Sequence, residues 1–205
     1  MTATLDRPAH TADEPTPSPK AQNARRCSSE TILLDESGAL LVFAADVATT
    51  AQLAFAIRHS SGLVHAAMPS FLLDKLRIPD QPVFASEDSR LSFTVAVDAA
   101  NGIGTGISAH DRARTLRVLA DGSSVPDDLV RPGHVMPVRC DDGGYRSRRR
   151  CWELAVEQVT AQGHAPVAVA VRLVDESGDI LDPAAAFSFG VTHGISVSDV
   201  RESSY

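Results

Sequence analysis

The chain has 205 residues, a formal net charge of −7 at pH 7 and a hydrophobic content of 43%, enough for one domain that buries roughly 70% of its unfolded surface. The acidic charge argues against nucleic acid and acidic membranes as partners, because both would repel the chain. Three irregularly spaced cysteines are too few for a disulfide framework, so we expect a cytoplasmic protein, and the longest apolar run, 38–45, is too short to span a bilayer.

The first thirty residues differ in composition from the rest. They contain four prolines and many small polar residues, and no apolar segment of the kind found in a secretory signal. This composition is typical of a disordered tail. We therefore expect a tail over 1–30 and one domain over 31–205.

From about residue 31, short apolar runs alternate with helical segments. We expect strands at 39–44, 63–68, 93–98, 167–174 and 195–197. We expect helices at 49–60, 108–121, 152–162 and 182–193. The clearest helix start is Ser108, which can cap the helix while Asp111 returns a hydrogen bond to it. No Gly/Pro-rich linker divides these elements, so the pattern predicts a single compact α/β (α+β) domain.

Four stretches carry a family resemblance and together cover nearly all of the chain after the tail. They are "FAADVATTAQLAFAIRHSSGLV" (43–64), "FTVAVDAANGIGTGISAHDRARTLR" (93–117), "DLVRPGHVMPVR" (128–139) and "VEQVTAQGHAPVAV" (156–169). In these motifs the chain resembles the 3,4-dihydroxy-2-butanone 4-phosphate synthases, which make the four-carbon unit of riboflavin. T-G-I-S-A-x-D-R-A-x-T followed by R-P-G-H-V-x-P is a highly specific combination.

The resemblance implies a compact α/β fold and a homodimer whose active sites lie near the subunit interface. It also implies a reaction on ribulose 5-phosphate, in which a divalent metal polarises the sugar oxygens and acid–base groups form an enediol before formate leaves. Such chemistry needs a Lewis acid, proton-transfer groups and a cationic or helix-terminal site for the phosphate.

Part of that site is retained. Arg112 and Thr115, with the neighbouring Asp111, match positions that lie close to the substrate in the family, and His134 matches its catalytic histidine. A histidine can transfer protons near neutral pH. From the residues alone, Arg112 and Asp111 could instead form a surface ion pair, and His134 could be merely structural.

The metal-binding part is rewritten. The family's acidic loop corresponds to the shortened stretch 33–46, which keeps only Asp35 and Glu36, and Cys151 replaces the histidine that binds the metal in the family. Because Mg²⁺ prefers oxygen ligands and a thiol replaces imidazole poorly, we expect neither a metal nor another cofactor.

Arginines are gained as acidic groups are lost. Arg172 stands where the family has a catalytic glutamate, and Arg149 and Arg150 stand at small or glycine positions. Arg148 and Glu153 are retained. Three added guanidinium groups would repel Mg²⁺ and attract an anion.

The first hypothesis is a divergent enzyme that binds a phosphorylated sugar or another small anion and catalyses a metal-independent lyase or isomerase-type reaction. Its catalytic residues would be His134, Glu153 and Cys151, with Cys151 as a nucleophile. Alternatively, Cys151 has no catalytic role and is a small buried residue. The expected substrate-binding residues are Arg112, Thr115, Asp111, Arg148, Arg149, Arg150 and Arg172.

A second hypothesis is a non-catalytic binding or regulatory homologue, as a homodimer or paired with a related chain. A third is residual synthase activity, which the loss of metal ligands disfavours.

Overall fold

The computed structural model describes residues 30–84, 86–87 and 92–201. The tail expected over 1–30 therefore lies outside the described residues except for its last position. No helix in the described part of the chain has the length and apolar character needed to cross a membrane.

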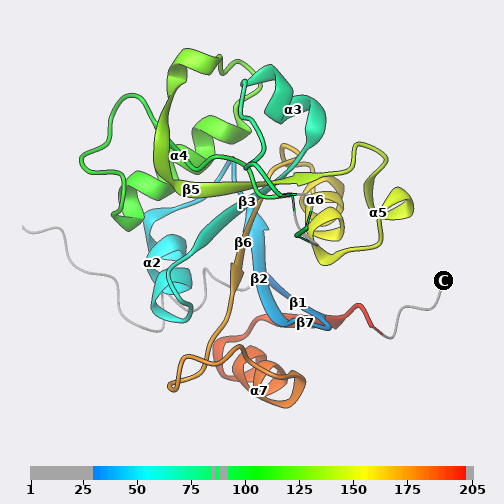
Figure 1. Cartoon of the computed structure of the whole chain (residues 1–205). Coiled ribbons are helices and arrows are strands. Elements are labelled where there is room, and N and C mark those ends of the chain that lie inside the picture. The colour runs from blue at the N-terminus through cyan, green and yellow to red at the C-terminus, as the bar shows by residue number, and fades with distance from the viewer. Residues whose placement is uncertain (1–29, 85, 88–91, 202–205) are drawn as a thin grey trace, which may run out of the picture.

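A seven-stranded mixed sheet forms the centre of the molecule, with the strand order β4-β5-β3-β6-β2-β1-β7 (Figure 1). The strands are β1 (Thr31–Asp35), β2 (Gly38–Ala44), β3 (Val64–Pro69), β4 (Val97–Ala99), β5 (Leu129–Cys140), β6 (Ala168–Arg172) and β7 (Ser196–Asp199). The helices are α2 (Thr50–Arg58), α3 (Ser70–Lys75), α4 (Ala109–Ala120), the short 3₁₀ turn η1 (Pro126–Asp128), α5 (Gly144–Ser147), α6 (Cys151–Ala161) and α7 (Pro183–His193).

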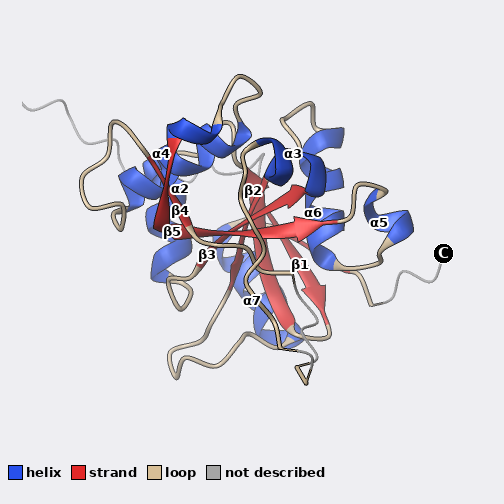
Figure 2. Cartoon of the chain, turned by 45° about the horizontal axis from the view of Figure 1, so that its top comes forward, coloured by secondary structure: helices blue, strands red, loops and turns tan. Residues whose placement is uncertain are grey.

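Helices cover the two faces of the sheet unequally. The larger hydrophobic core joins one face to α2, α3, α4 and α7, whereas the second core joins the opposite face to α6, through residues such as Trp152 and Val156. Figure 2 shows the strands lying between these helical layers. Because both faces are covered in the middle of the sheet, the central strands β2 and β3 are almost entirely apolar and buried.

The four expected helices agree closely with α2, α4, α6 and α7, whereas the short helices α3 and α5 were not expected. Thr49 and Gln52 form a capping box at the start of α2. Asp182 caps α7 ahead of Pro183, and Gly194 ends it in the left-handed conformation with φ 68°. These local signals fix the helix boundaries before any packing takes place.

The strands agree less well. The strand expected at 93–98 is largely wrong, because β4 spans only Val97–Ala99, while Phe93 and Thr94 make isolated bridges. β1 and β5 were not expected as strands at all. The polar residues of the R-P-G-H motif conceal the strand pattern of β5, whereas β1 is a short apolar run that was not assigned.

The start of α4 needs one correction. The Ser108 hydroxyl accepts a hydrogen bond from the Asp111 amide at 3.0 Å, as expected. The return bond expected from Asp111 is wrong: its carboxylate accepts instead from the amides of Gly104 at 3.2 Å and Gly106 at 3.1 Å. Asp111 thereby ties the glycine-rich loop before α4 to the first turn of that helix.

His65 is a titratable group inside the second core. It lies on β3 and is 5% exposed, with its ring stacked on Phe93 and edge-on to Trp152. Its Nδ1 lies 3.2 Å from the carbonyl oxygen of Ala170. Burial lowers the pKa of His65 from 6.5 to about 4, because a charged ring would be poorly solvated there.

The free energy of unfolding should therefore fall as the pH is lowered from about 6.5 to about 4. In this window the unfolded chain binds a proton at His65 while the folded chain does not, and the loss over the whole window is about 3 kcal/mol. Urea denaturation of the wild type and His65→Phe at pH 7 and pH 4 should show a smaller pH-dependent loss in the variant. Equal losses in the two proteins would contradict the burial of a neutral His65.

Candidate functional site

His134 lies in an interruption of the pairing between β4 and β5. The register shifts between Val97 and Asp98, which leaves residues 131–134 bulging out of the ladder. The R-P-G-H motif is part of β5, a segment in which no strand was expected. A Cβ at Gly133 would lie 2.0 Å from the backbone carbon of Val97, so only glycine allows the two strands to approach this closely.

Asp98 holds this bulge, and the sequence reasoning missed it. One carboxylate oxygen accepts a hydrogen bond from the backbone amide of His134 at 2.9 Å, and the other lies 2.6 Å from His134 Nδ1. The side chain of Asp98 is 6% exposed, against 39% for His134. An aspartate inside the apolar run "FTVAVDAA" was the available signal, because a buried carboxylate needs partners.

Thr115, Asp111 and Arg112, which were also expected to bind the ligand, lie in the interior of the protein. The Thr115 hydroxyl donates to the Asp111 carbonyl at 3.0 Å and accepts from the Ala99 amide at 2.9 Å. Arg112 is 5% exposed and donates to the Gly62 carbonyl rather than to Asp111. The contacts of Thr115 and Asp111 are those of structural residues.

Arg112 differs from these two. Its buried Nε has no hydrogen-bond partner in the described part of the chain. Burial lowers the pKa of its guanidinium, and the charge of nearby Asp98 opposes this shift. Among the described residues expected in this half of the site, Arg112 and His134 are the two with hydrogen-bonding atoms left for a ligand.

A second cluster joins the ends of β1 and β6 to the start of α6. Arg172 Nη1 donates to Asp35 Oδ1 at 2.8 Å, and its Nη2 donates to Asp35 Oδ2 at 2.6 Å. Arg172 Nη1 also donates to the Gly38 carbonyl at 2.8 Å. The Cys151 thiol donates to Asp35 Oδ2 at 2.7 Å. The carboxylate is thus held by a bidentate guanidinium and a thiol together.

Asp35 sits in a tight hairpin where the resemblance implies an acidic loop. It pairs with Gly38 across the turn from β1 to β2, and Gly38 has a φ of 99°, which favours glycine. Burial alone would raise the pKa of Asp35, but Arg172 and Cys151 outweigh it and hold the pKa below the usual value. The carboxylate is therefore charged at neutral pH.

The surroundings of Cys151 argue against a nucleophile. Its side chain is buried, and burial, reinforced by the charge of Asp35, raises the pKa of the thiol well above the usual range. A thiolate is the reactive form of cysteine, and this thiol stays protonated as a donor to Asp35. The alternative of a small buried residue fits these contacts.

The residues of this cluster do not fit the divalent metal that the resemblance implies. Both oxygens of Asp35 are hydrogen-bonded to Arg172, and Cys151 offers a protonated thiol. Over residues 30–84, 86–87 and 92–201, no three His, Cys, Asp or Glu side chains are grouped so that they could hold a metal ion. Mg²⁺ needs free oxygen ligands in octahedral arrangement, whereas the oxygens of Asp35 are already occupied by the guanidinium of Arg172.

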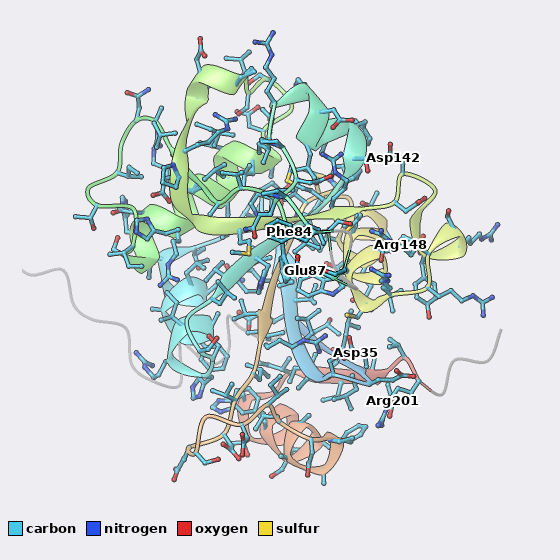
Figure 3. The ribbon with its side chains drawn as sticks, in the orientation of Figure 1. Asp35, Phe84, Glu87, Asp142, Arg148 and Arg201 are labelled. Atoms are coloured by element: carbon cyan, nitrogen blue, oxygen red, sulfur yellow. The ribbon has the colours of Figure 1, made fainter. Side chains whose placement is uncertain are left out.

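A cavity of about 380 Å³ opens beside this cluster. Its charged lining consists of Arg149, Arg150, Arg172, Arg201, Asp35 and Glu36. Trp152 forms part of the wall, with Arg172 lying 5.9 Å from the centre of its ring. Figure 3 shows Asp35 and Arg201 near each other in this view, with Arg148 above them in the segment between α5 and α6. Four arginines against two carboxylates give the lining a net positive charge.

Arg148 and Glu153 form an ion pair outside this lining. Arg148 also donates to the Arg139 carbonyl at 2.6 Å, and Glu153, 1% exposed, accepts from the Asp141 amide at 3.2 Å. The pair fastens the segment between β5 and α6. Neither side chain contributes its charge directly to the arginine-lined cavity.

His134 and Arg172 lie at the same level of the sheet. The registers of β3 with β5 and with β6 place the two residues on strands separated by β3 alone. Two strand spacings correspond to about 10 Å. His134 does not itself line the arginine-lined cavity.

Known proteins share both the sequence and this fold. The model of the 3,4-dihydroxy-2-butanone 4-phosphate synthase family matches residues 23–202. The enzyme of that name from Saccharomyces cerevisiae is 40% identical over 183 residues, covering 83% of this chain and 88% of that protein. The riboflavin biosynthesis protein RibBA of Salinispora tropica is 40% identical over 141 residues, covering 69% of this chain and 35% of that protein.

A solved 3,4-dihydroxy-2-butanone 4-phosphate synthase in complex with two magnesium ions superposes with a TM-score of 0.79 at 32% identity, covering 91% of this chain and 94% of that one. Sequence and fold agree over nearly the whole described chain. The chain therefore belongs to the 3,4-dihydroxy-2-butanone 4-phosphate synthase family of riboflavin biosynthesis.

Proposed function

We propose that this family member binds a small anion, of the sugar phosphate class, and does so without a divalent metal. The observation that carries the proposal is the bidentate contact of Arg172 with Asp35. It occupies both oxygens of Asp35 at the edge of the arginine-lined cavity, so a divalent cation would have to displace the guanidinium to reach this carboxylate.

The cavity supports an anionic ligand by its size and charge. About 380 Å³ is within the range of small-molecule sites. Arg149 and Arg150 add two positive charges to a lining in which Arg172 and Asp35 already neutralise each other. Guanidinium groups bind phosphate and carboxylate through paired hydrogen bonds, so these two side chains suit a phosphorylated ligand.

In the catalytic version of this proposal, His134 is the proton-transfer group and the reaction is of the lyase or isomerase type. The strand of His134, β5, is separated from the strand of Arg172 by β3 alone, which puts the two backbones about 10 Å apart, although His134 does not itself line the cavity. Glu153 and Cys151 have less support as catalytic groups, since one is paired with Arg148 and the other donates to Asp35.

A non-catalytic binding or regulatory homologue is the second candidate. It is favoured by the contacts of Glu153 with Arg148 and of Cys151 with Asp35, because these contacts engage two of the three side chains proposed for catalysis. The two candidates share the anion site and differ in turnover.

Arg149→Ala should weaken the binding of ribulose 5-phosphate by about 1.5–3 kcal/mol, the scale of a charge-assisted hydrogen bond. Calorimetric titration measures the change. Arg146→Ala is the matched control, because Arg146 is exposed on α5 and does not line the cavity. Equal affinities of the wild type and Arg149→Ala would refute the assignment.

Magnesium should have no effect on the activity or stability of this chain. Millimolar Mg²⁺ should leave the melting temperature unchanged, and ribulose 5-phosphate should give no formate that depends on Mg²⁺. Cys151→His alone should not restore such activity, because Arg172 still binds both oxygens of Asp35. Formate release that requires Mg²⁺ and stops with a chelator would contradict the proposal.

We further propose that the chain acts as a homodimer or pairs with a homologue, on the basis of the resemblance. Light scattering at micromolar concentration should give twice the chain mass of 21.7 kDa, unless a homologue is needed to complete the pair. A chain that is monomeric by itself, and that stays monomeric when a homologue is added, would contradict this part of the proposal. A cytoplasmic location stays a prediction.

A further inference from the structure

The hydrogen bonds around His134 single out Asp98 as more than a structural carboxylate. It contacts His134 twice, at the backbone amide and at Nδ1. The first contact fixes the main chain of the bulge, and the second fixes the rotation of the ring. A histidine held at both points has one orientation.

The two contacts also determine which ring nitrogen faces outward. Asp98 is nearly fully buried and lies against Nδ1, whereas 39% of the His134 side chain is exposed. A carboxylate accepts hydrogen bonds and cannot donate one when ionised. The proton of the neutral ring therefore belongs on Nδ1, which leaves a bare lone pair on Nε2.

A glycine loop seals this hydrogen bond. Gly106 has a φ of 86°, and a Cβ at this position would lie 2.1 Å from Asp98 Oδ2 and 2.7 Å from His134 Nδ1. The backbone of the loop thus packs directly on the contact between the two side chains. A side chain larger than hydrogen would push them apart.

The loop is in turn held by α4. Asp111 accepts hydrogen bonds from the amides of Gly104 and Gly106, and Ser108 caps the same helix turn. The pKa of Asp111 is held below its usual value, with a hydrogen bond from His110 as the largest lowering cause. Asp111 thereby anchors the cover over Asp98 and His134, and its expected contact with substrate stays a prediction.

We propose that Asp98 is a positioning residue that holds His134 as a proton acceptor at Nε2, under a cover formed by Gly106 and anchored by Asp111. In this role Nε2 takes a proton from the ligand, the electron pair of the broken bond stays on the ligand, and Asp98 balances the charge of the resulting imidazolium. The transfer of a proton from a ligand to His134 rests on the proposed function, whereas the geometry of Asp98 and His134 is independent of it.

Histidine side-chain ¹⁵N NMR of the full chain tests the geometry without any ligand. In the wild type, neutral His134 should show a protonated Nδ1 and a bare Nε2. Asp98→Ala should lose this single tautomer and Asp98→Glu should restore much of it. Gly106→Ala should disturb it as well, because its Cβ collides with the pair.

Asp46→Ala is the matched control. Asp46 lies 3.1 Å from His164 in a second Asp–His pair, so this variant should alter the signal of His164 and leave that of His134 unchanged. A wild-type spectrum with the proton on Nε2 of neutral His134, or an unchanged tautomer in folded Asp98→Ala, would overturn the proposal. The wild-type spectrum decides even if a variant fails to fold.

Hydrogen–deuterium exchange at the carbon beside the carbonyl of ribulose 5-phosphate tests the use of the pair. If the wild type exchanges this hydrogen, Asp98→Ala should slow kcat by about 100-fold or more with little change in KM. Equal kcat in the two proteins would overturn the positioning role. A correct tautomer without exchange in the wild type would support the pairing and refute the catalytic form of the proposed function.

Discussion

The chemistry available at this end of the sheet depends on the ion pair between Arg172 and Asp35. It links the end of β6 to the end of β1 through two hydrogen bonds of 2.8 and 2.6 Å, and it draws in the Cys151 thiol at the start of α6. A partly buried carboxylate needs a counter-charge, and removing one partner of such a pair leaves an uncompensated charge. Here the counter-charge is the guanidinium of Arg172, a side chain of the same protein. Asp35 is therefore compensated by groups of the chain itself, and Arg149, Arg150 and Arg201 line the same cavity.

The polar residues of the family motifs make two kinds of contact. Some bond only to other groups of the protein, and others leave part of the side chain exposed. Thr115 and Asp111 bond backbone groups, Asp111 also contacts His110, and Arg148 pairs with Glu153, which satisfies most of these polar atoms. Oε2 of Glu153 is buried without a hydrogen-bond partner among the described residues. His134 differs because much of its ring is exposed while its Nδ1 is fixed. Buried partners hold it in place, and the exposed edge is left for a ligand.

The sequence predicted the four longest helices, because their signals are local, and the loss of the metal ligands stays a prediction that rests on the replaced motif residues. Thr49, Ser108 and Asp182 are cap residues that act within one turn, and a cysteine or arginine in place of a ligand changes the donor set wherever the chain folds. The partner of His134 could not be deduced in this way. Asp98 reaches it only through a shift of register between two strands 36 residues apart, and a bulge of this kind depends on Gly133 packing against the neighbouring backbone. The same limit explains why the added Arg172 was expected to face a ligand: its partner Asp35 lies 137 residues away along the chain.

The guanidinium of Arg172 binds both oxygens of Asp35, and we propose that it thereby leaves no site for a divalent metal. Electron paramagnetic resonance of Mn²⁺, a spectroscopic substitute for Mg²⁺, tests this claim most directly, because bound Mn²⁺ loses the sharp signal of the free ion. Titration of the wild-type chain with Mn²⁺, with and without ribulose 5-phosphate, should leave the free-ion signal at its full intensity. Loss of one or more equivalents of that signal per chain, reversed by the mutation Asp35→Ala, would contradict the account.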